Sequence, residues 1–406
     1  MTLNLVFQKV LTSVSAKGST RLSFIIALLG IIMLPSFVYA LPQFPIRFGM
    51  DIYGDHMHGH EDDSMTMDCS VCHVNPTGGG MRNEHGLQFS MEKLPTWKTS
   101  EENKETLMGA KINNFFSIGA DLRFAYLLAE SESSSPYKNS FFPMQADIYF
   151  ALMPHQNFTL YYQNGIQGIR EVFGLIHDLP ASAHLKFGKF LPPFGLKLDD
   201  HTSFIREKLG FGNNTALDSD AGVEVGFAKG LWFGNAAIFN GSGSSLFTGT
   251  GSNADDNRAK GVSATGGFKA PRFWLAGSYF HNTTGDTNNE ETSDYIGGYS
   301  AIHIWQLSLL GEWDHISTET STSRTKGQVA YAEANMSLYQ GVVAKVKYDL
   351  YDPDIDASGD ILQRMTIGFD LYPYPSAEVL IQYRKNKEES NEVDNDQFLT
   401  MIHLYF

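Results

Sequence analysis

Long apolar runs are missing from nearly all of this sequence. Its mean hydropathy is −0.20, and the longest apolar stretch, Phe24 to Leu34, has 11 residues. A membrane-spanning helix needs about 20 apolar residues. The sequence therefore excludes a helical membrane protein.

Positive charge is also scarce. The 406 residues include 30 Lys and Arg against 45 Asp and Glu, which gives a formal net charge of −15 at pH 7. Nucleic-acid binding draws much of its affinity from contacts of Lys and Arg with phosphates. We therefore expect no nucleic-acid partner.

The first 40 residues have the pattern of a secretory signal peptide. Lys9, Lys17 and Arg21 supply positive charge with no acidic residue among them, and the apolar stretch follows. Ala40 provides a small residue at the expected cleavage position. We predict that residues 1–40 are removed, which takes the three positive charges away and changes the net charge from −15 to −18.

Cysteine occurs only twice, and both residues belong to one motif, Cys69-Ser70-Val71-Cys72-His73. Cys-x-x-Cys-His is the pattern of covalent c-type haem attachment. The thiols of Cys69 and Cys72 can add to the haem vinyl groups, and His73 then lies within reach of the iron as its proximal ligand. We therefore predict one covalent haem c.

A Cys-x-x-Cys pair also occurs in thioredoxin-like redox centres, in zinc sites and as a local disulfide. A thioredoxin-like centre has a βαβ context, which this sequence does not show, and a structural zinc site normally takes four ligands. A disulfide would make no use of His73. An exported chain favours haem attachment over all three.

The sequence leaves the distal ligand of the iron open. Residues 51–68, directly ahead of the motif, are rich in His, Met and acidic residues. Each of these His residues has the alternative of a solvated position in a loop. The candidates are His56, His58, His60, Met65 and Met67 before the motif and Met81, His85 and Met91 after it.

The motif continues into Asn75-Pro76-Thr77-Gly78-Gly79-Gly80 and then into the run from Met81 to Gly86. Three consecutive glycines let the backbone turn tightly and approach a flat cofactor, although a flexible linker would use the same residues. The segment Cys69 to Gly86 resembles the short cytochrome c module that precedes some bacterial outer-membrane barrels. In that pattern an aromatic residue often stands at the position of His85, which argues against His85 as an obligatory ligand. We predict a small, mostly irregular haem module over residues 41–108.

From about Phe115 onward the sequence alternates between apolar and polar residues with the period of two that indicates β-strands. The alternation recurs nearly everywhere, aromatic residues make up 13% of the chain, and no long amphipathic helix stands out. A transmembrane β-barrel explains this better than a soluble sandwich, because its apolar side chains face lipid and its polar ones face a wet lumen. The inferred lumen residues have mixed charge: Asp121, Arg123, Asp147, Lys186, Glu312, Asp314, Glu333, Lys345, Lys347, Asp370, Glu378 and Arg384.

The spacing of turn signals supports the same fold. Outer-membrane barrels have short periplasmic turns and longer outer loops, and short links here alternate with longer polar segments such as Gly241–Lys260 and Ser317–Thr325. We predict an all-β fold in which residues 109–406 form an antiparallel transmembrane β-barrel of about 16 strands. The terminal Phe406 resembles the signal by which such barrels are recognised for insertion into the outer membrane.

One expected outer loop carries a further resemblance. Phe187 to Leu196, followed by His201 to Glu207, resembles a stretch of the phosphate-selective porin family. In that family this loop folds into the pore and narrows it, which implies that Lys197, Arg206 and Lys208 lie near the constriction. Ordinary exposed loop charges are the alternative. Phosphate selectivity is not implied, because the lumen charges are mixed and the outer loops are mostly acidic.

Two functions fit these features. The first is a porin-like outer-membrane protein whose haem takes part in electron transfer across or at the membrane, with periplasmic or extracellular cytochromes as partners. The alternative is a passive diffusion porin for small solutes or ions, with the haem module as a plug, sensor or docking element. A weaker third possibility is that the His-rich and Met-rich segment captures metal ions for the channel. We expect no enzyme activity, contact with outer-membrane lipid and, by resemblance to porins, a homotrimer.

Overall fold

The computed structural model describes residues 69–92, 94, 96–98, 110–130, 137–166, 168–200, 202–210, 217–242, 257–285, 289–390 and 393–406. All of them belong to one compact unit, Phe37–Phe406. The predicted signal peptide lies outside the described residues, and so do His56, His58, His60, Met65 and Met67.

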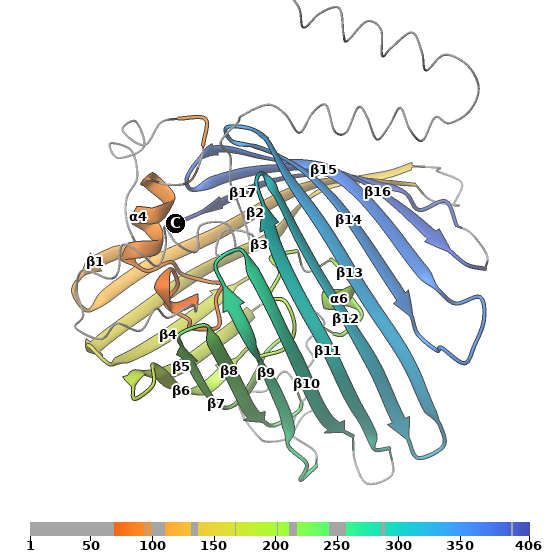
Figure 1. Cartoon of the computed structure of the whole chain (residues 1–406), viewed down its shortest axis with the longest axis horizontal. Coiled ribbons are helices and arrows are strands. Elements are labelled where there is room, and N and C mark those ends of the chain that lie inside the picture. Colours follow the sequence, from red (N-terminus) through yellow and green to blue (C-terminus); the bar gives the residue numbers. More distant parts are fainter. Residues whose placement is uncertain are drawn as a thin grey trace, which may run out of the picture. The chain divides into compact units, whose positions relative to one another are not determined.

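The chain folds into a closed antiparallel barrel of 16 strands, with one short extra strand, β1 (Lys111–Asn113), paired to β2 (Figure 1). Each strand pairs with the next, and β17 pairs with β2 from Gln397↔Ala129 to Tyr405↔Asp121, which closes the sheet. The predicted barrel is thus confirmed. Its strands are β2 (Phe116–Glu130), β3 (Tyr137–His155), β4 (Phe158–Gly165), β5 (Gly168–Leu179), β6 (Ala183–Phe190), β7 (Asp220–Lys229), β8 (Trp232–Phe239), β9 (Gly261–Ala270), β10 (Phe273–Thr284), β11 (Glu291–Ile304), β12 (Leu307–Thr320), β13 (Arg324–Tyr339), β14 (Val342–Asp352), β15 (Leu362–Tyr374), β16 (Ala377–Glu388) and β17 (Gln397–Tyr405).

The two faces of the wall differ as the alternation predicts. Outward side chains are apolar and exposed, for example Val225 and Ile367, each 55% exposed. Inward side chains are polar and buried within the lumen, for example Lys186 and Asp370, each 0% exposed. All the lumen residues inferred from the sequence are buried. The wall is therefore built to face lipid on the outside and polar groups on the inside.

The connections alternate between short turns on one side and, mostly, longer loops on the other. Strands β12 and β13 are an exception, because they extend through most of the segment Ser317–Thr325 that was expected to be a loop. Thr320 N donates to Ser323 O at 2.8 Å and closes the connection between them. Ser and Thr hydroxyls satisfy such a turn locally, so a polar segment can end a long hairpin with almost no loop.

The described part of the N-terminal module is more ordered than expected. It contains a 3-10 turn, η2 (Cys69–Val71), and a nine-residue helix, α4 (Glu84–Glu92), which Figure 1 shows beside the C-terminus of the chain. Asn83 Oδ1 accepts a hydrogen bond from Gly86 N at 2.8 Å, which caps the start of α4. No helix among the described residues is long and apolar enough to cross a membrane.

Candidate functional site

The segment Cys69–Glu92, hereafter the plug, is bound to side chains that point into the lumen. Asn75 Nδ2 lies 3.4 Å from Glu171 Oε1 on β5, and Lys186 Nζ on β6 donates to Thr77 Oγ1 at 3.1 Å. The plug backbone takes part as well, since Met81 N donates to the hydroxyl of the buried Tyr161 on β4 at 3.3 Å. The plug therefore lies inside the barrel.

The glycine run of the plug allows this close fit. Gly78, Gly79 and Gly80 have φ values of +85°, +78° and +62°, which side-chain-bearing residues rarely adopt. A Cβ on Gly78 would lie 3.0 Å from Cys69 Sγ, and one on Gly80 would lie 2.2 Å from Tyr161 Oη. The glycines thus bring the backbone against both the thiol and the barrel wall, which a flexible linker would not require.

The connection between β6 and β7 also folds into the lumen. We call the segment from Leu191 to Lys208, of which 191–200 and 202–208 are described, the lumen loop. It holds a short helix, α6 (Phe204–Glu207). Its backbone reaches strands far across the barrel, as the family resemblance implies: Leu196 N donates to Glu312 on β12 at 2.6 Å and Phe204 N to Asp349 on β14 at 2.8 Å.

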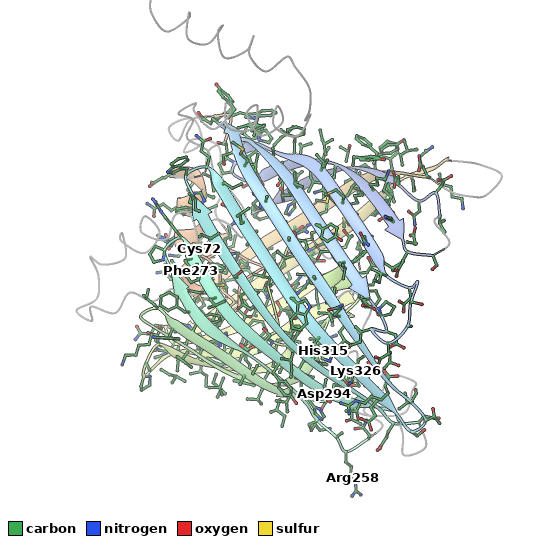
Figure 2. All side chains as sticks on the ribbon, turned by 45° about the vertical axis from the view of Figure 1, so that its right-hand side comes forward. Cys72, Arg258, Phe273, Asp294, His315 and Lys326 are labelled. Atoms are coloured by element: carbon green, nitrogen blue, oxygen red, sulfur yellow. The ribbon has the colours of Figure 1, made fainter. Side chains whose placement is uncertain are left out.

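A cavity of about 410 Å³ lies between the plug, the lumen loop and the barrel wall. Cys69, Cys72 and His73 line it from the plug. Figure 2 shows Cys72 toward the end of the barrel where β10 begins, at Phe273, whereas Asp294, His315 and Lys326 lie toward the other end. Strand β10 begins at a short turn, so the cavity lies in the half of the lumen nearer the short turns.

The lumen loop contributes two of its three predicted cations to this cavity. Lys197 and Arg206 line it, and Lys197 Nζ donates to Gly78 O of the plug. Lys208 is not among the lining residues and pairs with the neighbouring Glu207 at 2.6 Å. The loop therefore carries positive charge to the region of the haem motif.

One turn of backbone brings the predicted haem ligands together. His73 N and Cys72 N both donate to Cys69 O, at 2.9 and 3.2 Å, and both cysteines are free thiols. Burial raises the pKa of Cys72 to about 11, so the group is a protonated thiol at neutral pH. Burial, with help from the charges of Arg82 and Lys197, lowers the pKa of His73 to about 4, so its imidazole is neutral.

These residues fit a covalent haem. Addition to a vinyl group uses a thiol, and axial ligation uses a neutral imidazole. His73 Nδ1 is buried without a hydrogen-bond partner in the described part of the chain. The adjoining cavity has a volume typical of cofactor sites, and apolar and aromatic side chains form part of its wall, among them Phe233, Trp274 and Tyr299.

None of the three described candidates for the distal ligand, Met81, His85 and Met91, lines the cavity. Met81 is 1% exposed and packs toward β2, with its Cγ 3.5 Å from the position of a Cβ on Gly119. His85 belongs to α4 and is likewise absent from the lining. The distal ligand stays a prediction. Among the residues described, no group of three or more His, Cys, Asp and Glu side chains is placed to hold a metal ion.

A second histidine, His403 on β17, also lines the cavity and was not among the residues predicted from the sequence. Its Nδ1 lies 3.1 Å from Glu378 Oε2 and its Nε2 lies 3.1 Å from Asp121 Oδ2. Because both nitrogens are engaged, His403 serves the wall and not an iron atom. The alternation of β17 could have identified it as an inward residue, since it is one position away from the outward Ile402 and Leu404.

The likeness to known proteins lies in the barrel. The structure is similar to an anion-selective porin from Comamonas acidovorans, with a TM-score of 0.56, 10% identity and coverage of 72% of this chain and 99% of that one. The protein has the fold of a porin-like outer-membrane barrel. Similar values hold for OmpT of Vibrio cholerae (0.55, 9%, 73% and 100%) and for the outer-membrane channel DcaP of Acinetobacter baumannii (0.54, 10%, 74% and 100%).

No protein-family model matches the chain, and no curated protein does. Identities this low relate the porin-like barrel to porins by fold alone. These similarities cover about three quarters of this chain and nearly all of each neighbour. The remaining quarter of this chain has no counterpart in them and is interpreted from its own residues.

Proposed function

We propose that this protein is an outer-membrane channel whose lumen is narrowed by the plug and the lumen loop, and that the plug carries a covalent haem c on Cys69 and Cys72. The channel part is supported by the porin-like fold. The observation that carries the haem part is that the whole Cys-x-x-Cys-His motif faces a cavity inside the lumen. This corresponds to a diffusion porin with the haem module as its plug.

Within this proposal the chain's own residues have distinct tasks. Cys69 and Cys72 would hold the porphyrin, and the neutral imidazole of His73 would be available to bind its iron. Lys197 connects the lumen loop to the plug through Gly78 O, so that the two lie against each other in the lumen. When bound, haem would supply one-electron redox chemistry.

Electron transfer is the second candidate, and the position of the motif favours it. A haem at this depth would be shielded from bulk solvent by the wall and the lumen loop, and such burial is one of the means by which a protein sets a haem potential. The apolar band of a barrel is about 25 Å tall, so a single haem in one half of the lumen would need partner cytochromes to carry electrons across.

A haem stain on denaturing gels of separated membranes tests the proposal. We expect covalent haem in the outer-membrane band of the wild type and none in Cys72→Ala, which should still show the heat-modifiable gel mobility of a folded barrel. An exported wild-type protein without haem would refute the haem part, and a Cys72→Ala barrel that fails to assemble would refute the separate roles of plug and wall.

Two measurements on the haem-loaded protein then separate the candidate roles. A six-coordinate spectrum with reversible reduction favours electron transfer. Substantial single-channel conductance in planar bilayers favours diffusion. Cys72→Ala serves as the haem-free control for both.

A further inference from the structure

Trp274 on β10 and Lys269 on β9 are two cavity-lining side chains on neighbouring strands. Neither has a role in the contacts between plug, lumen loop and wall described above. They are direct cross-strand partners, so both project from the same face into the lumen. Lys269 Nζ lies 4.8 Å from the centre of the Trp274 ring and 4.1 Å from that of Phe233 on β8. The rings hold the ammonium group in position.

The indole N–H of this pair is a donor without an acceptor. Trp274 is only 7% exposed, and its Nε1 is buried with no hydrogen-bond partner among the residues that the structure describes. An indole nitrogen can only donate, and a buried donor that stays unpaired is costly. The missing partner is therefore an acceptor that occupies the cavity.

Lys269 points to the charge of that acceptor, because it makes no ion pair among the described residues. The acidic side chains of the same cavity are already engaged. Arg123 Nη2 lies 3.1 Å from Asp121 Oδ2 and 2.5 Å from Asp199 Oδ1, and Glu171 Oε1 accepts from Leu191 N at 3.1 Å. A cation and a free N–H donor on one wall, with no described acidic side chain paired with them, suit a carboxylate.

We propose that Lys269 and Trp274 together bind a carboxylate, and specifically a propionate of the haem attached to Cys69 and Cys72. The inference rests on the proposed function, since it concerns the same cavity. The thioether links hold the vinyl side of a porphyrin at the plug, so the propionate side is free to meet the wall. The site fixes the haem against the barrel and, through the nearby positive charge, favours its reduced form.

The test is the haem midpoint potential of Lys269→Gln and Trp274→Phe, titrated between pH 5 and 9 in the full-length protein. Loss of the lysine charge should shift the equilibrium toward oxidised haem by about three- to tenfold, a fall of about 30 to 59 mV for one electron. Loss of the indole donor should raise the pKa of the propionate, so the potential of Trp274→Phe should vary more steeply with pH. Covalent haem content and heat-modifiable mobility should stay at wild-type levels.

The chain offers a matched control pair. Lys229 on β7 and Trp232 on β8 are also direct cross-strand partners, but both are exposed and neither lines the cavity. Lys229→Gln and Trp232→Phe should leave the potential and its pH dependence unchanged. Haem-loaded Lys269→Gln and Trp274→Phe proteins that titrate like these controls would overturn the inference.

The haem stain keeps this failure apart from that of the proposed function. If the wild type has no haem, the propionate assignment is overturned together with the haem proposal. In that case, addition of succinate while the ionic current through the channel is recorded tests whether Lys269 and Trp274 bind a dissolved carboxylate instead. A block present in the wild type and lost in Lys269→Gln would assign the site to a dissolved carboxylate, and no block in either would reject a carboxylate site.

Discussion

Single residues of the lumen loop determine how firmly it is held, and Asp200 is the clearest case. Its carboxylate accepts from Lys347 Nζ on β14 at 2.7 Å and from Thr202 Oγ1 at 2.6 Å, and it lies 3.9 Å from an Arg384 nitrogen. Burial alone would raise the pKa of Asp200. The two cations outweigh burial and hold the pKa well below its ordinary value.

The depressed pKa gives a pH dependence with a definite sign. A carboxylate whose pKa is lower in the folded state adds stability above its ordinary pKa, near 4, and loses it as the pH falls through the folded value. We expect Asp200→Asn to lower the free energy of unfolding at pH 7 by about 3 kcal/mol, because Lys347, 2% exposed, keeps its charge without its close partner. Urea unfolding of detergent-refolded protein measures this, and the difference from wild type should shrink below about pH 4.

The pair of His177 and Asp178, 2.7 Å apart near the end of β5 and with the Asp178 side chain 70% exposed, provides the control. Asp178→Asn should change the unfolding free energy by less than about 1 kcal/mol, since exposed ion pairs contribute little. Equal losses in Asp178→Asn and Asp200→Asn would contradict the role assigned to Asp200.

At the scale of elements, the contact between the lumen loop and β12 predicts how far the loop limits conductance. Gly195 has a φ of +60°, and a Cβ there would lie 2.0 Å from Glu312 Oε1 on the opposite wall. Gly195→Val should therefore displace the loop from β12 and widen the path, which single-channel recordings would show as a conductance at least twofold above wild type. Gly230→Val is the matched control, because Gly230 has a similar φ of +59° with nothing within 4 Å of an added Cβ. Unchanged conductance in Gly195→Val would mean that the loop does not limit flow.

The elements differ in how far the sequence predicts them. The wall strands repeat one physical requirement, apolar outside and polar inside, over long stretches, so their alternation was readable. Helix α4 was missed because it is short, contains Gly86 and depends on tertiary contacts. A Cβ on Gly86 would lie 2.1 Å from Cys72 O, so this helix is formed against the haem motif and not by its own periodicity.

At the scale of the whole molecule, the candidate site likewise contains residues that the sequence predicts and residues that only the folded barrel brings together. Cys69, Cys72 and His73 are contiguous, so the sequence shows their chemistry directly. Lys269 and Trp274 belong to the site only because the barrel closes around the plug, and nothing in their local sequence distinguishes them from other inward residues. The wall of a lumen site is set by strand register, which a single sequence does not specify.

The barrel and the plug should also separate in function. The wall is closed by its own strand pairing from β2 to β17, whereas the plug is held by a few contacts with lumen residues. Gly80→Val should unseat the plug, because a branched side chain is strained at a φ of +62° and would collide with Tyr161. Gly168→Val is the control, since Gly168 has a φ of +89° with nothing within 4 Å.

We expect Gly80→Val to keep the heat-modifiable mobility of a folded barrel and to raise single-channel conductance above that of Gly168→Val. Plug and lumen loop are two restrictions on one path, so relief of either alone leaves the other in place. The Gly80→Val, Gly195→Val double variant should therefore gain more conductance than the two single gains combined. A double variant no more conductive than Gly195→Val would show that the plug leaves the path open, and that the cavity beside Cys69, Cys72 and His73 lies next to the channel and not across it.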